Sequence, residues 1–280
     1  MSVLALIDDW PVASPVVAVL VDGEIVDDRG PTSLILPWAS VTKLVTSLAA
    51  LLAVAEGHLD LATPAGPDGS TVAHLLAHAS GLDAERDRAR VAPGVRRIYS
   101  NAGYEELARV VAARVGMGFE RWVRERILEP LGMTDTVLAG SPGSGISGPL
   151  GDLVGLVEEL QRPTLLPPEL ATAQRSVAFP GIAGVLPGFG RHDANDWGLG
   201  PEIRAHKRPH WTGASNSPAT LGHFGAAGGF VWIDPLRRVA CACLTGTPFG
   251  PWAATAWPVL SDAVVLEHGR EVPGPVTDPS

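Results

Sequence analysis

The sequence contains very little lysine and no excess of positive charge. Lysine and arginine together number 21, yet only Lys43 and Lys207 are lysine. The formal net charge is -9. An acidic chain of this kind is not expected to bind nucleic acid or an anionic membrane. The one short basic run, at 204–208, is expected to be a solvated loop.

Cysteine is also scarce, and long apolar runs are absent. Cys241 and Cys243 stand two residues apart in an apolar segment, where a disulfide would be strained, and two thiols are too few to hold a metal. We expect both to be small core residues in a reducing compartment. No apolar run reaches the ~18 residues that a membrane span needs. Residues 1–9 lack the basic start of a secretory signal, so we expect a cytoplasmic protein.

The composition and the order of the predicted elements indicate an α+β protein. The 280 residues are 46% hydrophobic, and strand-like segments lie near both chain ends. They predict one antiparallel sheet built from both termini, flanked by helices, with a mainly helical insertion. We divide the chain into a sheet domain (1–33 and 218–270), a mainly helical domain (34–217) with the site at the interface, and a flexible tail (271–280). The expected elements are strands at 16–21, 24–26, 229–233 and 239–245, and helices at 4–10, 44–56, 72–77, 105–115, 119–128 and 252–268.

Ser40 and Lys43 carry the clearest chemical signal. Three residues apart at the start of a helix, their side chains lie on one face. A partly buried lysine can lose its proton, whereas arginine cannot, so the pair has the form of a serine nucleophile with a lysine base. The alternative is an N-cap serine beside an exposed lysine.

Two further segments bear groups that such a pair could use. A tyrosine near a cationic lysine can have a lowered pKa, so Tyr99 could move protons, while Asn101 could bind a substrate amide or simply cap a helix. His223 precedes a glycine-rich turn at the start of the terminal strands. Gly225 allows close backbone approach there, and the Ala226 N–H could face the Ser40 N–H in an oxyanion hole.

Together and in this order, these segments resemble the serine β-lactamase and penicillin-binding-protein family, closest to class C β-lactamases and their esterase relatives. The resemblance covers nearly the whole chain and includes 71–82, 130–136 and 197–200. It implies a β-lactamase/transpeptidase-like fold, with Ser40 acylated, Lys43 and Tyr99 as a coupled proton-transfer pair, and Asn101 and His223 at the substrate. No cofactor or metal is implied, and the oligomeric state is left open.

Phe224 departs from that pattern. Penicillin-recognising relatives usually carry a threonine or serine there, whose hydroxyl helps to bind the β-lactam carboxylate. We therefore expect a serine hydrolase working through an acyl-enzyme, a carboxylesterase on small neutral esters. The alternatives are a β-lactamase or D-alanyl-D-alanine carboxypeptidase, or a non-catalytic binding protein that retains the fold. The expected partner is a small ester or amide substrate, with no nucleic acid and no membrane.

Several other residues are expected to be structural. His74 and His78 have the spacing of a metal pair but no third ligand nearby, so we expect them to bond to the backbone. Trp38 and Trp211 are candidates for an acyl pocket, although core packing is the expected role. A Gly-x-Ser-x-Gly motif is absent, which disfavours an α/β-hydrolase.

Overall fold

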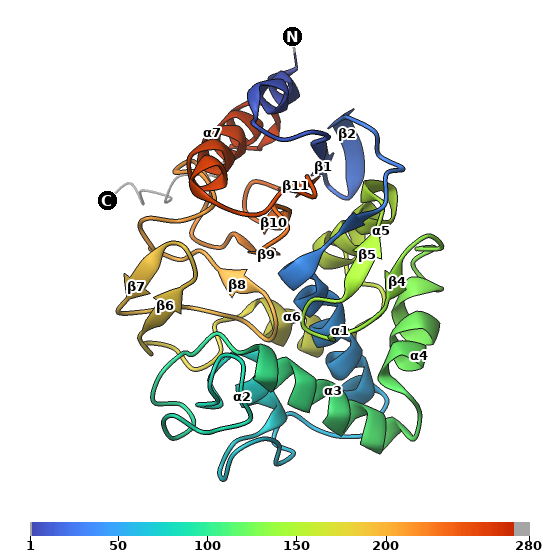
Figure 1. The fold of residues 1–280 in the computed structure, drawn as a ribbon, viewed down its shortest axis with the longest axis vertical. Helices are drawn as coiled ribbons and strands as arrows, with labels where there is room; N and C mark the ends of the chain where they lie inside the picture. Colours follow the sequence, from blue (N-terminus) through green and yellow to red (C-terminus); the bar gives the residue numbers. More distant parts are fainter. Residues whose placement is uncertain (1, 272–280) are drawn as a thin grey trace, which may run out of the picture.

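A six-stranded antiparallel sheet joins the two ends of the chain, in the order β2-β1-β11-β10-β9-β8. The computed structural model describes residues 2–271, and residues 272–280 of the predicted tail lie outside them. Figure 1 shows the blue N-terminal hairpin beside the orange and red C-terminal strands. The strands of this sheet are β1 (Val16–Val21), β2 (Glu24–Arg29), β8 (Glu202–Ile203), β9 (Leu221–Phe224), β10 (Phe230–Asp234) and β11 (Val239–Leu244).

The sheet is buried on both faces, which explains why its central strands read as unbroken apolar runs. Along β1, Val16 and Ala18 join one apolar cluster, whereas Val17 and Val19 join the other. β11 alternates in the same way, and Cys241 and Cys243 share one face as buried free thiols, as expected. Helices η1 (Val3–Asp9) and α7 (Pro251–His268) cover that face of the sheet.

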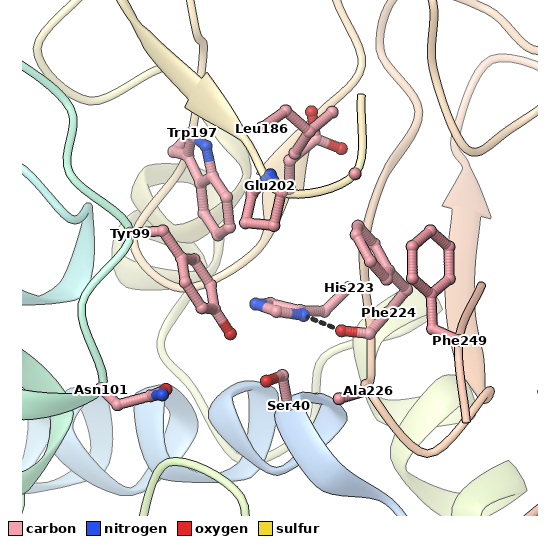
Figure 2. Close-up of a pocket in the computed structure, with 12 residues that line it drawn as sticks. Ser40, Tyr99, Asn101, Leu186, Trp197, Glu202, His223, Phe224, Ala226 and Phe249 are labelled. Atoms are coloured by element: carbon pink, nitrogen blue, oxygen red, sulfur yellow. Dashed lines mark hydrogen bonds between the residues drawn. The ribbon is translucent and has the colours of Figure 1, made fainter. Parts of the chain in front are cut away.

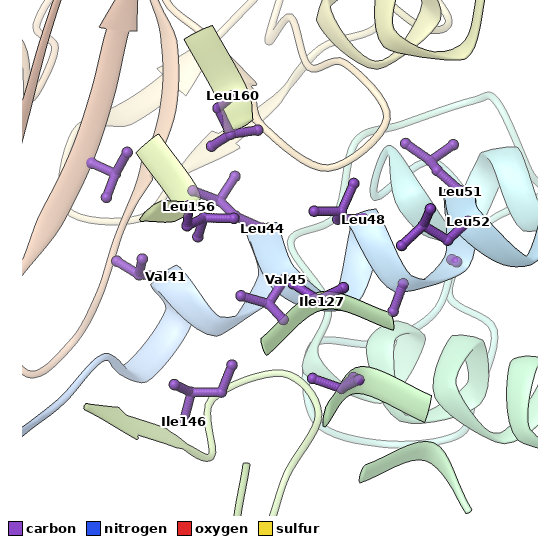
Figure 3. Close-up of a cluster of buried hydrophobic side chains, with 14 of the residues drawn as sticks. Val41, Leu44, Val45, Leu48, Leu51, Leu52, Ile127, Ile146, Leu156 and Leu160 are labelled. Carbon is purple, nitrogen blue, oxygen red and sulfur yellow. The ribbon is translucent and has the colours of Figure 1, made fainter. Parts of the chain in front are cut away.

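The opposite face packs on helices that lead to the rest of the chain. Helix α1 (Thr42–Ala55) is buried along nearly its whole length, and α5 (Leu150–Gln161) packs against β1, β10 and β11. Figure 3 shows apolar side chains of both helices, such as Leu44, Leu48 and Leu156, meeting in one cluster. This packing fixes the position of α1, and therefore of the residues at its N-terminus.

The remaining segments form the mainly helical part seen in cyan, green and yellow in Figure 1. The predicted helix at 119–128 is present, but its second half is a π-helical turn. The remaining helices are η2 (Ala39–Val41), α2 (Val72–Leu76), α3 (Asn101–Val115), α4 (Phe119–Val123), η3 (Arg124–Leu128) and α6 (Pro168–Arg175). Small sheets are formed by β3 (Leu36–Pro37), β5 (Ile146–Gly148) and β4 (Val137–Leu138), and by β6 (Gly184–Leu186) and β7 (Gly190–His192).

The predicted α+β architecture is confirmed: one antiparallel sheet is built from both chain ends and is flanked by helices. The sheet also takes in β8, which lies at 202–203, and the division into 1–33 plus 218–270 and 34–217 stays a prediction. Within residues 2–271, no helix is both long and apolar enough to cross a membrane.

The prediction of a solvated loop at 204–208 is right only in part: the run is a loop in which His206 and Arg208 are exposed, but its other two basic residues are buried. Lys207 is 3% exposed and Arg204 is 6% exposed. Lys207 is buried because it pairs with the buried carboxylate of Glu202, and composition alone could not reveal that this carboxylate is buried. Lys207 donates a hydrogen bond to Glu202 over 2.5 Å, and His210 and Trp211 donate to the same carboxylate over 2.9 and 3.1 Å.

Candidate active site

Ser40 lies in the single turn η2, directly before α1 and at the point where β9 ends. Its backbone N–H is in the first turn, so it has no partner within the helix. Ala39, the preceding residue, has a φ of +46°, a left-handed conformation that a non-glycine residue adopts at some strain. The strained turn holds the Ser40 hydroxyl at the edge of a cavity instead of in the packed body of α1.

Lys43 is completely buried one turn further along α1. Its ammonium nitrogen Nζ lies 2.6 Å from Asn101 Oδ1, 2.8 Å from the Gly143 carbonyl oxygen and 3.5 Å from Ser40 Oγ. It also lies 4.8 Å from the centre of the Tyr99 ring. The structure therefore brings together the three residues that the sequence placed in the catalytic group, although they come from different segments.

Burial lowers the pKa of Lys43 to about 7, while the nearby carboxylates of Glu85 and Glu105 act in the opposite direction. A lysine with this pKa is substantially neutral near physiological pH and can accept a proton from Ser40. This matches the role expected for Lys43 from the spacing of the motif.

The expectation of a lowered pKa for Tyr99 is wrong. Burial raises the pKa of the phenol above its usual value, and contact with the Ser40 hydroxyl offsets this only in part. A buried phenol surrounded by aromatic rings and neutral groups has little to stabilise its anion. These opposite pKa shifts favour Tyr99 as a proton donor and Lys43 as the base, and the division of roles between the two residues stays a prediction.

His223 is held as a neutral imidazole. Its Nδ1 donates to the Phe224 carbonyl oxygen over 2.7 Å, and since that oxygen can only accept, the proton must reside on Nδ1. Burial, followed by the charge of Lys43, lowers the pKa of His223 to about 3. The unprotonated Nε2 has no hydrogen-bond partner and faces Tyr99 in Figure 2.

Gly225 and Ala226 form the other side of the site. A Cβ atom on Gly225 would lie 2.4 Å from the Trp38 carbonyl oxygen and 3.2 Å from the Ser40 nitrogen, so only glycine permits this approach. Ala226 lines the same cavity as Ser40, as Figure 2 shows. The backbone at Ser40 and the backbone at Gly225 and Ala226 thus come close together, where the N–H groups of Ser40 and Ala226 could receive an oxyanion.

A cavity of about 240 Å³ opens above Ser40. Its walls are mainly apolar and aromatic, and it includes no lysine or arginine side chain. The one carboxylate at the wall, Glu202, already accepts hydrogen bonds from Lys207, His210 and Trp211. The lining residues are Ser40, Tyr99, Asn101, Leu186, Pro187, Gly188, Trp197, Glu202, His223, Phe224, Ala226 and Phe249.

The residues expected to be structural lie outside this cavity. Trp38 and Trp211 are buried in the core, and Trp38 donates to the Gly148 carbonyl oxygen. His78 Nδ1 accepts a hydrogen bond from the Ser100 N–H, and His74 contacts the Thr71 hydroxyl. Across residues 2–271, no group of histidines, cysteines and carboxylates could hold a metal ion.

Sequence reasoning missed four residues around the candidate catalytic group. Gly143 supplies a carbonyl oxygen to Lys43, and its N–H is held by the Ser141 hydroxyl, which donates in turn to Glu105. Glu85 accepts a hydrogen bond from Asn101 Nδ2 over 2.7 Å. Only the glycine- and serine-rich composition at 141–148 offered a signal, and it was interpreted as an ordinary loop.

Comparison with known proteins agrees with this geometry. The model of the Beta-lactamase family matches residues 11–264. A β-lactamase from Mycobacterium bovis of known structure is 45% identical, with a TM-score of 0.94 over 96% of this chain and 100% of that one. A curated human protein, beta-lactamase-like 1, is 44% identical over 75 residues, which are 22% of this chain and only 15% of that protein.

More distant structures share the fold alone. Simvastatin synthase (LovD) from Aspergillus terreus is 16% identical, with a TM-score of 0.78 over 94% of this chain and 92% of that one. EstCE1, described as a hydrolase with promiscuous acyltransferase activity, is 19% identical, with a TM-score of 0.75 over 94% and 97%. The match of the family model over most of the chain, together with the Mycobacterium bovis relative, establishes that this protein belongs to the β-lactamase family of serine hydrolases.

Proposed function

We propose that the protein is a carboxylesterase that hydrolyses small neutral esters with an apolar acyl group, through an acyl-enzyme on Ser40. The observation that carries this proposal is the lining of the cavity. Phe224 stands beside His223, where a hydroxyl would help to anchor a carboxylate. With His223 neutral and no lysine or arginine in the wall, a charged acyl group would lose its hydration without gaining a counter-ion.

The proposed reaction follows from the groups around Ser40. Neutral Lys43 accepts the Ser40 proton as Oγ attacks the ester carbonyl, and the oxyanion is received by the N–H groups of Ser40 and Ala226. The carbon–oxygen bond to the alcohol then breaks, and the alcohol takes the proton from Lys43, either directly or through Tyr99, which gives its own proton to the alcohol and regains one from Lys43. Water then gives a proton to neutral Lys43 as it attacks the acyl-enzyme, and that proton passes to Ser40 Oγ as the acid is released.

A β-lactamase or D-alanyl-D-alanine carboxypeptidase activity is the second candidate. It is favoured by one observation, the 45% identity to a Mycobacterium bovis protein described as a β-lactamase. Either activity would use the same Ser40 and Lys43 chemistry, so the two candidates differ in the acyl pocket. The cytoplasmic location expected from the start of the chain stays a prediction.

The test compares kcat/KM for nitrophenyl butyrate and nitrocefin in the wild type, Ser40→Ala and Phe224→Thr. Wild type should prefer the ester, and Ser40→Ala should abolish turnover of both substrates while the thermal midpoint stays unchanged. Phe224→Thr should improve nitrocefin by at most the ~10–100-fold that one hydrogen bond to a charge allows. Its ester turnover should stay similar or fall. A wild type that strongly prefers nitrocefin would overturn the esterase proposal in favour of the β-lactamase.

A further inference from the structure

The hydrogen bonds around Lys43 leave one position for its lone pair. A neutral amine carries two N–H donors and one lone pair. Two acceptors lie close to Nζ, namely Asn101 Oδ1 at 2.6 Å and the Gly143 carbonyl oxygen at 2.8 Å. If they take the two protons, the lone pair is left for the third neighbour, Ser40 Oγ at 3.5 Å. The two acceptors together thus favour the orientation of neutral Lys43 in which its lone pair points to Ser40.

The two acceptors differ in how firmly they are fixed. The Gly143 carbonyl belongs to the backbone and cannot exchange its oxygen for a donor. The Asn101 amide can rotate by half a turn and present its NH₂ group instead. In that orientation the amide would donate to the lone pair of neutral Lys43, and the base would be engaged before it met the Ser40 proton.

Glu85 opposes that rotation. Its carboxylate accepts from Asn101 Nδ2 over 2.7 Å, and an ionised carboxylate has no proton to offer to the amide oxygen. Rotation of Asn101 would therefore place two acceptors, the amide oxygen and the Glu85 carboxylate, against each other. The backbone on either side is also held, because the Asn101 N–H donates to the Ala84 carbonyl oxygen over 2.7 Å.

We infer that Glu85 is a positioning residue, which fixes the Asn101 amide with its oxygen toward Lys43 and so reserves the lysine lone pair for Ser40. This inference rests on the proposed function, because it concerns the same base. Glu85 itself is exposed and touches neither Ser40 nor Lys43 through a hydrogen bond in the described part of the chain. Its charge also raises the pKa of Lys43, but its effect on the orientation of the amide passes through Asn101.

The test replaces the acceptor at position 85 by a donor. Glu85→Lys should favour the rotated amide, so kcat for nitrophenyl butyrate should fall by about 10- to 100-fold, the range for one hydrogen bond to a charged group. Rates are compared at pH values where Lys43 is already neutral in every variant, so that a change in its pKa does not contribute. KM should change little. Glu85→Ala only releases the amide and should lower kcat by a smaller factor.

The matched control is Asp87→Lys, which makes the same change of charge two residues along the same exposed loop. It should leave kcat within about twofold of wild type. The thermal midpoint of each variant is measured alongside, and since both side chains are exposed, we expect no loss of folding.

A double-mutant cycle separates positioning from general effects. In Asn101→Asp the carboxylate has an oxygen at both positions, so rotating it by half a turn still leaves an acceptor facing Lys43. In this background, Glu85→Lys should therefore lower kcat far less than in wild type. A Glu85→Lys enzyme with wild-type kcat, or an equal loss in both backgrounds, would overturn the inference. A wild type without Ser40-dependent ester hydrolysis would instead overturn the proposed function, and this inference with it.

Discussion

At the scale of single residues, Lys43 combines two properties that an arginine at the same position could not supply. It is buried, and it can be neutral near physiological pH. Replacement by arginine keeps the positive charge but removes the neutral form. We expect Lys43→Arg to lower kcat/KM for nitrophenyl butyrate by at least ~100-fold, as the loss of a general base usually does. If the variant stays active, Lys43 is only an electrostatic support, and Tyr99→Phe should then be the more damaging change.

The same residue sets the expected pH dependence. Burial gives Lys43 a pKa of about 7, below its usual value of 10.5, and the neutral form is the active one. The value of kcat/KM should therefore be low below pH 6 and rise as the pH passes through about 7. Titration of His223 cannot produce this rise in kcat/KM near pH 7, because its pKa is about 3. A profile that is flat between pH 5 and 9 would contradict the assignment of Lys43 as the base.

At the scale of secondary-structure elements, the site depends on the close approach of β9 to the start of α1. Gly225 makes this approach possible, since a Cβ atom there would meet the Trp38 carbonyl oxygen at 2.4 Å. Gly225→Ala should push the β9–β10 turn away from Ser40, lower kcat by at least ~100-fold and destabilise the fold by about 1–3 kcal/mol. Ester kinetics and urea unfolding measure the two effects.

The matched control for that change is Gly151→Ala. Gly151 lies in α5, and the nearest atom to an added Cβ would be 3.9 Å away. Alanine should be neutral or slightly stabilising there, because it is the better helix former. Equal losses in the two variants would show that close packing at Gly225 is not the cause.

Comparison of these elements with the sequence shows what could be predicted. The helices around Ser40 and the strands at 16–21 and 239–245 were recognisable, because a helix start and a continuous apolar strand are local patterns. Glu85 and Gly143 were not, because each acts through a partner in another segment, Asn101 for Glu85 and Lys43 for Gly143. Their own segments have the composition of ordinary loops. The ion pair of Glu202 with Lys207 was missed for another reason: the two residues are close in the sequence, but composition does not show that both side chains are buried.

At the scale of the whole molecule, the buried carboxylate of Glu202 connects β8 to the segment that follows it, through hydrogen bonds from Lys207, His210 and Trp211. Burial would raise the pKa of Glu202, but His210 and Lys207 outweigh it and bring the pKa to about 2, below the usual 4.5. The stability gained from this ionised carboxylate is present above pH 4.5 and is lost as the pH falls toward 2. The thermal midpoint of the wild type should therefore decrease as the pH is lowered from 4.5 toward 2.

Removal of the carboxylate should also destabilise the fold at neutral pH. Glu202→Gln leaves Lys207 buried without an ionised partner, and we expect a loss of about 3–5 kcal/mol. Asp8→Asn, which breaks the exposed pair with Arg29, should leave the free energy of unfolding close to that of wild type. Denaturant titrations at pH 7 measure both. A Glu202→Gln protein as stable as wild type would mean that Lys207 is neutral in the fold.

The burial of both lysines has a consequence for the surface of the molecule. Lys43 is 0% exposed and Lys207 is 3% exposed, so the folded chain offers solvent no side-chain amine. Amine-reactive labels and lysine-specific proteases can then act on a lysine side chain only after the structure has opened. Cleavage after Lys207 would report the opening of the region around β8, and cleavage after Lys43 would report the opening of α1. The scarcity of lysine thus gives the native protein two built-in probes of local unfolding, one of them inside its own catalytic group.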